Sequence, residues 1–204
     1  MVTEVIAPAA QRPLAPSPGS SRETAAISPT SLVYDFDDIY REHFAFIWRS
    51  ARRLGVDPSF LDDVVQEVFV IVHRRLAGFE RRSTLRTWLF GITLRVARDH
   101  RRSRARKPLE PVQAPDLLSN PARSPHEHLE RREAVRTLYS ILNELSDEQR
   151  EIFVMADLEE MPMSDVAATL EINENTGYGR LRAARRFFDE ALVRRRARDE
   201  WRLR

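Results

Sequence analysis

The 204-residue sequence predicts an all-α protein of two small helical domains joined by a flexible linker. Apolar residues recur at the three-and-four spacing of amphipathic helices through most of the chain. Glycine is scarce, with six residues in total, and the alternating pattern of β-strands is almost absent. Two proline-rich stretches interrupt the periodic segments, so the chain divides into an arm, two domains, a linker and a tail.

The N-terminal arm covers residues 1–31, which are rich in proline, alanine and serine and lack apolar periodicity. Such a composition does not bury enough apolar surface to form a core, so we expect disorder there. The first helical domain is expected at residues 32–104. Its first helix begins near Asp35 and ends before Gly55.

The second helix of this domain is predicted at about 59–77. Many of its residues are β-branched and favour strands by propensity, but its apolar positions follow helical periodicity. These positions are Leu61, Val64, Val65, Val68, Val72 and Leu76. Gly78 ends this helix, residues 79–83 form a short loop, and a third helix runs from about Thr84 to Arg104.

A linker is predicted at residues 105–125, which contain five prolines and no periodic apolar pattern. The second helical domain follows at residues 126–196, with four helices. Ser146 is a predicted N-cap, and Gln149 three residues later completes a capping-box pattern. The spacing therefore predicts a helix that starts directly after Ser146.

The last helix carries most of the positive charge of the second domain, and its N-cap is either Asn173 or Asn175. Residues 144–174 contain ten acidic side chains and one basic one, whereas residues 177–198 contain eight arginines and two acids. A basic tail, residues 197–204, ends the chain. This change of sign at a helix-turn-helix boundary predicts that the last helix faces a polyanion, of which nucleic acid is the obvious example.

A second basic block lies in the first domain. Residues 74–107 contain twelve lysine and arginine side chains against two acids, although the formal net charge of the chain is only +2. Aromatic residues are interleaved with these arginines. Such a surface suits single-stranded nucleic acid, because bases stack on rings while arginines follow the backbone.

Several classes of function are disfavoured by what the sequence lacks. The absence of cysteine excludes disulfides and thiolate metal sites, and it fits a cytoplasmic location. No signal peptide or membrane-spanning run is visible, so we expect no membrane insertion. Phosphate-binding glycine loops and nucleophile motifs are missing, and the five histidines are not spaced as metal ligands. We therefore expect no catalytic residue, no metal and no cofactor.

Three segments, in the right order, resemble bacterial RNA polymerase sigma factors of the small extracytoplasmic-function (ECF) type. Their region 2.2 corresponds to LDDVVQEVF at residues 61–69. Regions 2.3 and 2.4 correspond to FERRSTLRTWLFGITLRVARDHRR at 79–102, and region 4 to LSDEQREIFVMADLEEMPMSDVAATLEINENTGYGRLRAARRFF at 145–188. The resemblance covers about residues 34–190. This chain departs from the family at Arg95, usually Asn, and at Gly177, Tyr178 and Gly179, often Val, a basic residue and Ser.

The resemblance implies a sigma region 2 helical bundle and a sigma region 4 helix-turn-helix. It implies that the chain binds core RNA polymerase, recognises the minus-thirty-five and minus-ten promoter elements and promotes DNA melting, without catalysis. The last helix would enter the major groove, with its first residues at base edges and the others at phosphates. The implied minus-thirty-five contacts are Asn175, Thr176, Tyr178, Arg180, Arg182, Arg185 and Arg186.

The loop at residues 79–83 is implied to capture a base flipped out of the minus-ten element. Removing a base from the stack costs a few kcal/mol, which stacking and polar contacts offset. The residues implied in minus-ten binding and melting are Phe79, Arg81, Arg82, Ser83, Arg86, Trp88, Arg95, Arg98, Arg101 and Arg102. Trp88 has an alternative role as a core residue, because it lies at helical spacing from Leu85 and Ile92.

The helix at 59–77 is implied to dock on the clamp helices of the β′ subunit of core RNA polymerase. The implied polymerase-binding residues are Asp62, Asp63, Gln66, Glu67 and Val70. Without the resemblance, these acids would be interpreted as an ordinary solvated face. An anti-sigma factor is a further partner that the family implies.

Two other functions remain as alternatives. A stand-alone helix-turn-helix regulator that binds duplex DNA explains residues 145–190 but leaves residues 59–104 without a role. A sigma mimic or adaptor would dock on polymerase without reading DNA. Co-purification with core polymerase distinguishes a sigma factor from the stand-alone regulator. Promoter-specific transcription distinguishes a sigma factor from the mimic or adaptor.

Overall fold

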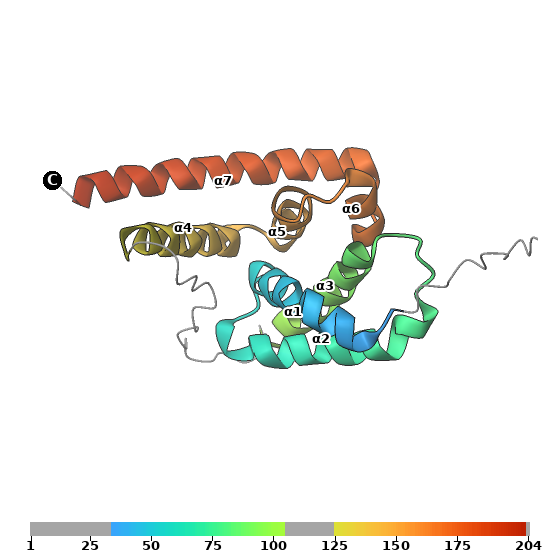
Figure 1. Ribbon diagram of the computed structural model, residues 1–204. Coiled ribbons are helices and arrows are strands. Elements are labelled where there is room, and N and C mark those ends of the chain that lie inside the picture. The colour runs from blue at the N-terminus through green and yellow to red at the C-terminus, as the bar shows by residue number, and fades with distance from the viewer. Residues whose placement is uncertain (1–33, 105–124, 203–204) are drawn as a thin grey trace, which may run out of the picture. The chain divides into compact units, whose positions relative to one another are not determined.

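A computed structural model describes residues 34–104 and 125–202, so the predicted arm and nearly all of the predicted linker lie outside the described residues. Within the described ranges every regular element is a helix (Figure 1). The all-α prediction is therefore confirmed. The main elements are α1 (Phe36–Arg53), α2 (Leu61–Arg75), α3 (Leu85–Arg104), α4 (Pro125–Glu144), α5 (Asp147–Phe153), the π-helix η3 (Val154–Leu158), α6 (Met163–Leu170) and α7 (Glu174–Arg202).

Helix α1 begins and ends where the sequence predicts. The Asp35 side chain accepts a hydrogen bond of 3.2 Å from the backbone N–H of Asp37, which satisfies one of the donors left open in a first helical turn. After α1, Gly55 adopts a φ of 88°, a left-handed conformation that costs glycine little. Asp57 then caps the short 3₁₀ helix Pro58–Phe60 by accepting 3.0 Å from the N–H of Ser59.

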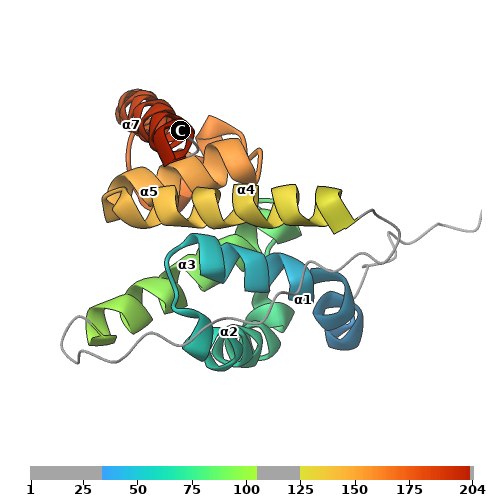
Figure 2. The ribbon, with the colours of Figure 1, turned by 90° about the vertical axis from the view of Figure 1, so that its left-hand side faces the viewer.

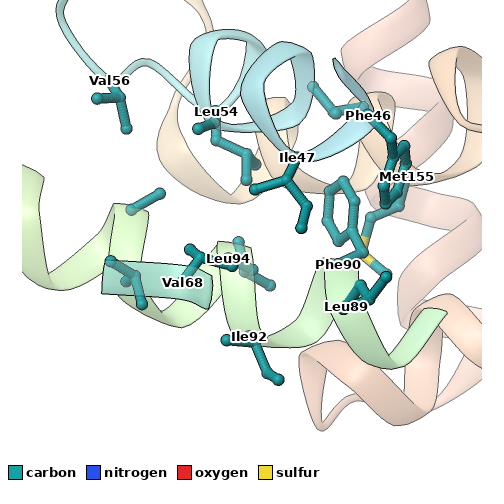
Figure 3. Close-up of a cluster of buried hydrophobic side chains, with 14 of the residues drawn as sticks. Phe46, Ile47, Leu54, Val56, Val68, Leu89, Phe90, Ile92, Leu94 and Met155 are labelled. Carbon is teal, nitrogen blue, oxygen red and sulfur yellow. The ribbon is translucent and has the colours of Figure 1, made fainter. Parts of the chain in front are cut away.

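Helix α2 is a helix despite its β-branched sequence, because one face is buried throughout. Its buried residues are Leu61, Val64, Val65, Val68, Phe69 and Val72. The three helices α1, α2 and α3 pack on one another around a core that includes Ile47, Leu54, Val68 and Leu94 (Figure 3). Burying each such side chain contributes about 1.5–3 kcal/mol, which outweighs the small propensity for strand.

The second domain is built around α7, which packs against α4, α5 and α6. The predicted capping box is present: Ser146 Oγ accepts 3.3 Å from the Gln149 N–H, and Gln149 Oε1 accepts 3.4 Å from the Ser146 N–H. Phe153 stacks on Phe188 with ring centroids 4.9 Å apart, which joins α5 to α7.

Arg150 has a structural role that we did not predict. Its guanidinium is buried and donates to the carbonyls of Leu142 at 2.6 Å and Leu145 at 3.0 Å, so it satisfies carbonyls at the end of α4. Burial lowers the pKa of Arg150 from its ordinary value. The one signal in the sequence that could have identified it is that Arg150 is the only basic residue in the acidic segment 144–174.

Helix α7 extends further than expected, to Arg202, so residues 197–202 of the predicted tail continue the helix. No glycine or proline occurs between residues 180 and 202, and arginine, alanine and leucine favour helix there. At its other end the domain begins one residue early, because Pro125 occupies the first position of α4, where its fixed φ is tolerated.

The helices of both domains belong to one compact unit, Tyr34–Arg204. Helix α4 passes beside α1 (Figure 2), where the Arg52 guanidinium lies 4.8 Å from the ring centroid of Tyr139. Met155 of η3 is fully buried and lies with Phe46 and Phe90 of the first domain (Figure 3). The two domains therefore share part of their apolar core.

Candidate nucleic-acid and polymerase interfaces

The N-terminal turn of α7 is built by Asn173, whose Oδ1 accepts 2.8 Å from the backbone N–H of Thr176. This settles the choice between the two predicted caps. Asn175 is consequently free of a capping role and lies exposed in the first turn. A capped and exposed first turn is the part of a recognition helix that reaches base edges.

The two glycines of this turn have different surroundings. A Cβ on Gly177 would lie 2.6 Å from Sδ of Met163, so the absence of a side chain allows α6 and α7 to approach closely. A Cβ on Gly179 would meet no atom within 4 Å. Gly177 is thus explained by packing, whereas no contact in the structure explains Gly179.

The predicted recognition residues share one stretch of α7 but differ in exposure. Tyr178 is 55% exposed, and Asn175, Arg182, Arg185 and Arg186 are also exposed, whereas Thr176 and Arg180 are half-buried.

Two of these arginines pair with acids of their own domain. Arg180 lies 3.2 Å from Glu148, and Arg185 binds Asp157 through two nitrogens, with Nε to Oδ2 at 2.9 Å and Nη2 to Oδ1 at 2.5 Å. The hydrogen bonds that Arg185 donates to Asp157 raise the pKa of Arg185. The local acids therefore hold these side chains in place on the helix.

The loop at residues 79–83 brings aromatic and basic side chains together, as predicted. The Phe79 ring lies 4.9 Å from the Trp88 ring and 5.9 Å from the Tyr34 ring. The Arg81 guanidinium lies 4.9 Å from the centroid of the Tyr34 ring. Arg82 pairs with Glu80 at 2.6 Å, and Ser83 is half-buried beside them.

Trp88 is half-buried and packs against the core, so its ring also has the structural role that we considered as an alternative. Tyr34 was missed by the sequence analysis, because it stands at the edge of the predicted arm and belongs to no periodic pattern. The three rings form a small aromatic group on which a base can stack.

The arginines of α3 that were predicted to contact DNA fall into two sets. Arg95 and Arg102 are exposed. Three others bind acids of the second domain: Arg86 binds Glu159 at 2.5 Å, Arg98 binds Glu151 at 2.8 and 2.6 Å, and Arg101 binds Asp147 at 2.6 Å. Hydrogen bonding to Glu151 raises the pKa of Arg98.

The sequence analysis did not identify the acids that bind these arginines, which it only counted within the acidic segment 144–174. Glu151 and Glu159 are only 3% and 7% exposed. Carboxylates are rarely buried unless paired, and the pairing residues lie far away in the sequence. No local signal therefore identified them. Arg53 of α1, which binds Glu159 at 2.5 Å, was missed for the same reason.

The predicted polymerase-binding residues all lie on the exposed face of α2. Asp62, Asp63, Gln66 and Glu67 are exposed, and Val70 is 43% exposed. The valines between them are buried, so the helix separates an apolar face from an acidic one. Asp62 and Asp63 also stand in the first turn, where the helix dipole favours negative charge.

No helix within residues 34–104 and 125–202 is both long and apolar enough to cross a membrane.

Comparison with known proteins agrees with this arrangement. Residues 39–107 match the family model for sigma-70 region 2, and residues 136–188 match the model for sigma-70 region 4. The RNA polymerase sigma factor NccH of Alcaligenes xylosoxydans xylosoxydans is 28% identical over 74% of this chain and 83% of its own length. The sigma factor CnrH of Cupriavidus metallidurans is 27% identical over 81% of this chain and 91% of its own length.

Solved structures show the same fold. CnrH in complex with the cytosolic domain of CnrY matches with a TM-score of 0.57 and 26% identity, over 78% of this chain and 87% of that one. The sigma factor RpoE in complex with the anti-sigma factor NepR, from Bartonella quintana, matches with a TM-score of 0.63 and 21% identity, over 78% and 97% of the two chains. Because both family models match in the predicted order and together cover more than half of the chain, this protein belongs to the sigma-70 family of RNA polymerase sigma factors, in its ECF group.

Proposed function

We propose that this sigma factor binds core RNA polymerase through the acidic face of α2, contacts the minus-thirty-five element with α7, and holds the opened minus-ten element with the 79–83 loop and α3. The observation that carries the proposal is the aromatic group of Tyr34, Phe79 and Trp88 flanked by arginines, in the domain that also exposes the acidic face. Bases stack on such rings in proteins that hold single strands.

In the duplex-binding step, Asn175 and Tyr178 meet base edges from the first turn of α7. Arg182 and Arg186 follow on the exposed side of the same helix and contact base edges or phosphates. Arg185 reaches a phosphate by exchanging its contact with Asp157. The domain borders that we predict for this division of work are residues 32–104 and 126–196, with residues 105–125 as the predicted linker.

In the melting step, Phe79 and Trp88 stack against bases while Arg81, Arg82 and Ser83 contact the strand. Arg95 and Arg102 are exposed on α3 and reach duplex phosphates next to the melted edge. The chain itself carries out no catalytic step. Promoter DNA in bacteria lies in the cytoplasm, where we place this activity.

We also propose an anti-sigma factor as a partner. The solved structure of the 26% identical CnrH contains the cytosolic domain of a second protein, CnrY, and supports this proposal.

Transcription by core polymerase and this chain on a genomic promoter library tests the proposed function directly. We expect initiation at a discrete set of promoters with shared minus-ten and minus-thirty-five elements. Association with polymerase but no transcription from any template would favour an adaptor instead. Binding to duplex DNA without association with polymerase would favour a stand-alone regulator.

The polymerase contact has its own test. Asp63→Arg with Glu67→Arg reverses two charges on the exposed face of α2, so we expect assembly with core polymerase to be lost in co-purification. Asp189→Arg with Glu190→Arg makes the same charge change on the exposed surface of α7 and is expected to assemble normally. Normal assembly of the folded Asp63 and Glu67 variant would remove this face from the interface.

A further inference from the structure

Gly179 lies inside α7 at a position where no contact with the described residues requires a glycine. It is exposed, and a Cβ there would meet no atom within 4 Å. Its backbone does not require one either, because Gly55 is the glycine that has a positive φ among the described residues. Glycine inside a helix is less favourable than alanine, so Gly179 weakens α7 without a gain in packing or in backbone conformation.

The side chains around Gly179 are those that we propose to meet duplex DNA. Residues that are three, four and seven positions apart share one face of a helix. Gly179 therefore lies on the same face as Asn175, Arg182 and Arg186, all of which are exposed. Tyr178 beside it is 55% exposed. Larger side chains thus surround one bare position, which we call the Gly179 notch.

The two arginines on this face differ from those on its flanks. Arg180 and Arg185 pair with acids of their own domain. The side chains of Arg182 and Arg186 have no hydrogen-bond or ion-pair partner among the residues that the structure describes. Both guanidinium groups can therefore contact DNA next to the Gly179 notch without first breaking a contact within the protein.

We propose that Gly179 determines base specificity, and that its notch receives the 5-methyl group of one thymine in the minus-thirty-five element. The proposal rests on the proposed function, because it takes this face of α7 to lie in the major groove. The thymine methyl is the apolar group that base pairs present in that groove. The bare Cα of glycine offers neither a donor nor an acceptor, so its contact with the methyl group is apolar.

The Gly179 notch favours thymine over the other bases for two reasons. Cytosine lacks the methyl group, so it would leave part of the notch empty and lose that apolar burial. The polar edges of guanine and adenine would face a surface that offers no hydrogen bond, and an unpaired polar group in a dry contact is unfavourable. A Cβ at position 179 would occupy the space of the methyl group.

Removing the methyl group from the DNA tests this contact in the wild-type chain. Holoenzyme formed from core polymerase and the full chain first selects duplexes from a pool with a randomised minus-thirty-five region. Each thymine of the selected sequence is then replaced singly by deoxyuridine, which lacks only the methyl group. We expect affinity to fall roughly fourfold at one thymine, the factor that corresponds to burying one methyl group.

Gly179→Ala adds a group of methyl size to the protein instead. We expect it to bind the thymine duplex at least roughly fivefold more weakly, because the contact is overpacked. Deoxyuridine at the one sensitive position should restore most of this loss, since the new Cβ takes the space of the missing methyl group. The melting temperature of the variant should equal or exceed that of the wild type, which separates a lost DNA contact from a folding defect.

Two further glycines supply matched controls. Gly177→Ala should lower both the melting temperature and DNA binding, because its Cβ would lie 2.6 Å from Sδ of Met163, and deoxyuridine should not restore its binding. Gly78 lies in the first domain, and a Cβ there would also meet no atom within 4 Å. Gly78→Ala should therefore leave binding of the selected duplex unchanged.

Wild-type binding by Gly179→Ala would overturn the proposal, and so would a loss that deoxyuridine relieves at no position. Either result together with enrichment of a defined duplex sequence would overturn the thymine contact alone. Enrichment of no sequence by the holoenzyme would overturn the proposed function, and the thymine contact with it.

Discussion

The arginines of α7 and those of α3 differ in which domain supplies the acids that pair with them. Arg180 and Arg185 on α7 pair with Glu148 and Asp157 of their own domain. Arg86, Arg98 and Arg101 on α3 pair with acids of the other domain. Arg180 and Arg185 of α7 are thus paired within one domain, whereas Arg86, Arg98 and Arg101 of α3 are paired only where the two domains touch. One chain therefore contains a basic surface on α7 whose ion pairs lie within its own domain and a second basic surface on α3 whose ion pairs cross to the other domain.

This difference predicts that salt affects the charge interactions of the two surfaces differently. Exposed charges are screened at physiological ionic strength, whereas buried pairs are screened much less. The contact between α3 and the second domain combines two buried carboxylates with partly exposed arginines. We therefore expect rising salt concentration to weaken DNA binding by α7 steeply. The ion pairs between α3 and the second domain should weaken less over the same range.

The largest effect is expected from removing a buried aromatic side chain of α3. Phe90 is fully buried, and its ring lies 6.4 Å from that of Phe46. We expect Phe90→Ala to lower the free energy of unfolding by about 3–5 kcal/mol, measured by urea denaturation, because a large cavity remains. Phe187→Ala, on the half-buried side of α7, is the matched control and should cost less. A loss below about 1 kcal/mol for Phe90→Ala would show that α3 is held by ionic contacts alone.

Arg182→Ala tests the proposed DNA-binding surface of α7. Arg182 is exposed on α7, so we expect its loss to weaken promoter binding by roughly 1–3 kcal/mol if it grips a base, in free chain and holoenzyme alike. A phosphate contact would instead lower the salt slope by about one unit. Arg180→Ala should act in the same direction. The control is Arg194→Ala, further along the same helix. Wild-type binding of both variants at every salt concentration would remove them from the interface.

Alanine variants of Gly177 and Gly179 form a matched pair that tests how closely α6 approaches the start of α7. Gly177→Ala forces Met163 to move, since the new Cβ would lie 2.6 Å from Sδ, and we expect a loss of about 1 kcal/mol in unfolding free energy with weaker promoter binding. Gly179→Ala meets no atom and should stabilise the helix by up to about 1 kcal/mol. Thermal denaturation of the two variants measures the difference. Identical shifts would mean that α6 and α7 are not in close contact.

The smallest expected effect is the pH dependence of stability that arises from His100 of α3. Burial lowers the pKa of His100, and the charge of Arg104 lowers it further, while its ring lies 5.2 Å from that of Phe60. A histidine whose folded pKa lies below its unfolded value of 6.5 contributes full stability above pH 6.5. That contribution is lost as the pH falls from 6.5 toward the folded pKa.

Urea unfolding measured across this range should therefore show declining stability, and His100→Gln should flatten the decline. His73→Gln, on the exposed face of α2, is the control and should keep it. An unchanged decline in the His100 variant would assign the effect to other groups.

Local patterns in the sequence were sufficient for most of the fold. The helix limits at Asp35, Gly55 and Ser146 follow from side chains that cap or break a helix within three residues of themselves. The helical state of α2 follows from periodicity, because burial along one face outweighs β-propensity. The aromatic and basic content of the 79–83 loop was also visible, because those residues are close together in the chain.

Other features depend on residues that are distant in the chain. The choice of Asn173 over Asn175 depends on the direction of one side chain, and the need for Gly177 depends on Met163 approaching from another helix. The partners of Arg86 and Arg98 lie 73 and 53 residues away. Charge counts along the chain marked these arginines as available to DNA. In the folded unit they are bound to Glu159 and Glu151.

The amino-acid sequence alone thus determined where the helices lie, the caps at Asp35 and Ser146, the acidic face of α2 and the family, because each depends on spacing over a few residues or on contiguous motifs. Folding in three dimensions decided which charges are exposed and which are neutralised. The physical reason is that a carboxylate is buried only when its counter-charges arrive from elsewhere in the chain, and their arrival depends on the packing of α5 and η3 against α1 and α3.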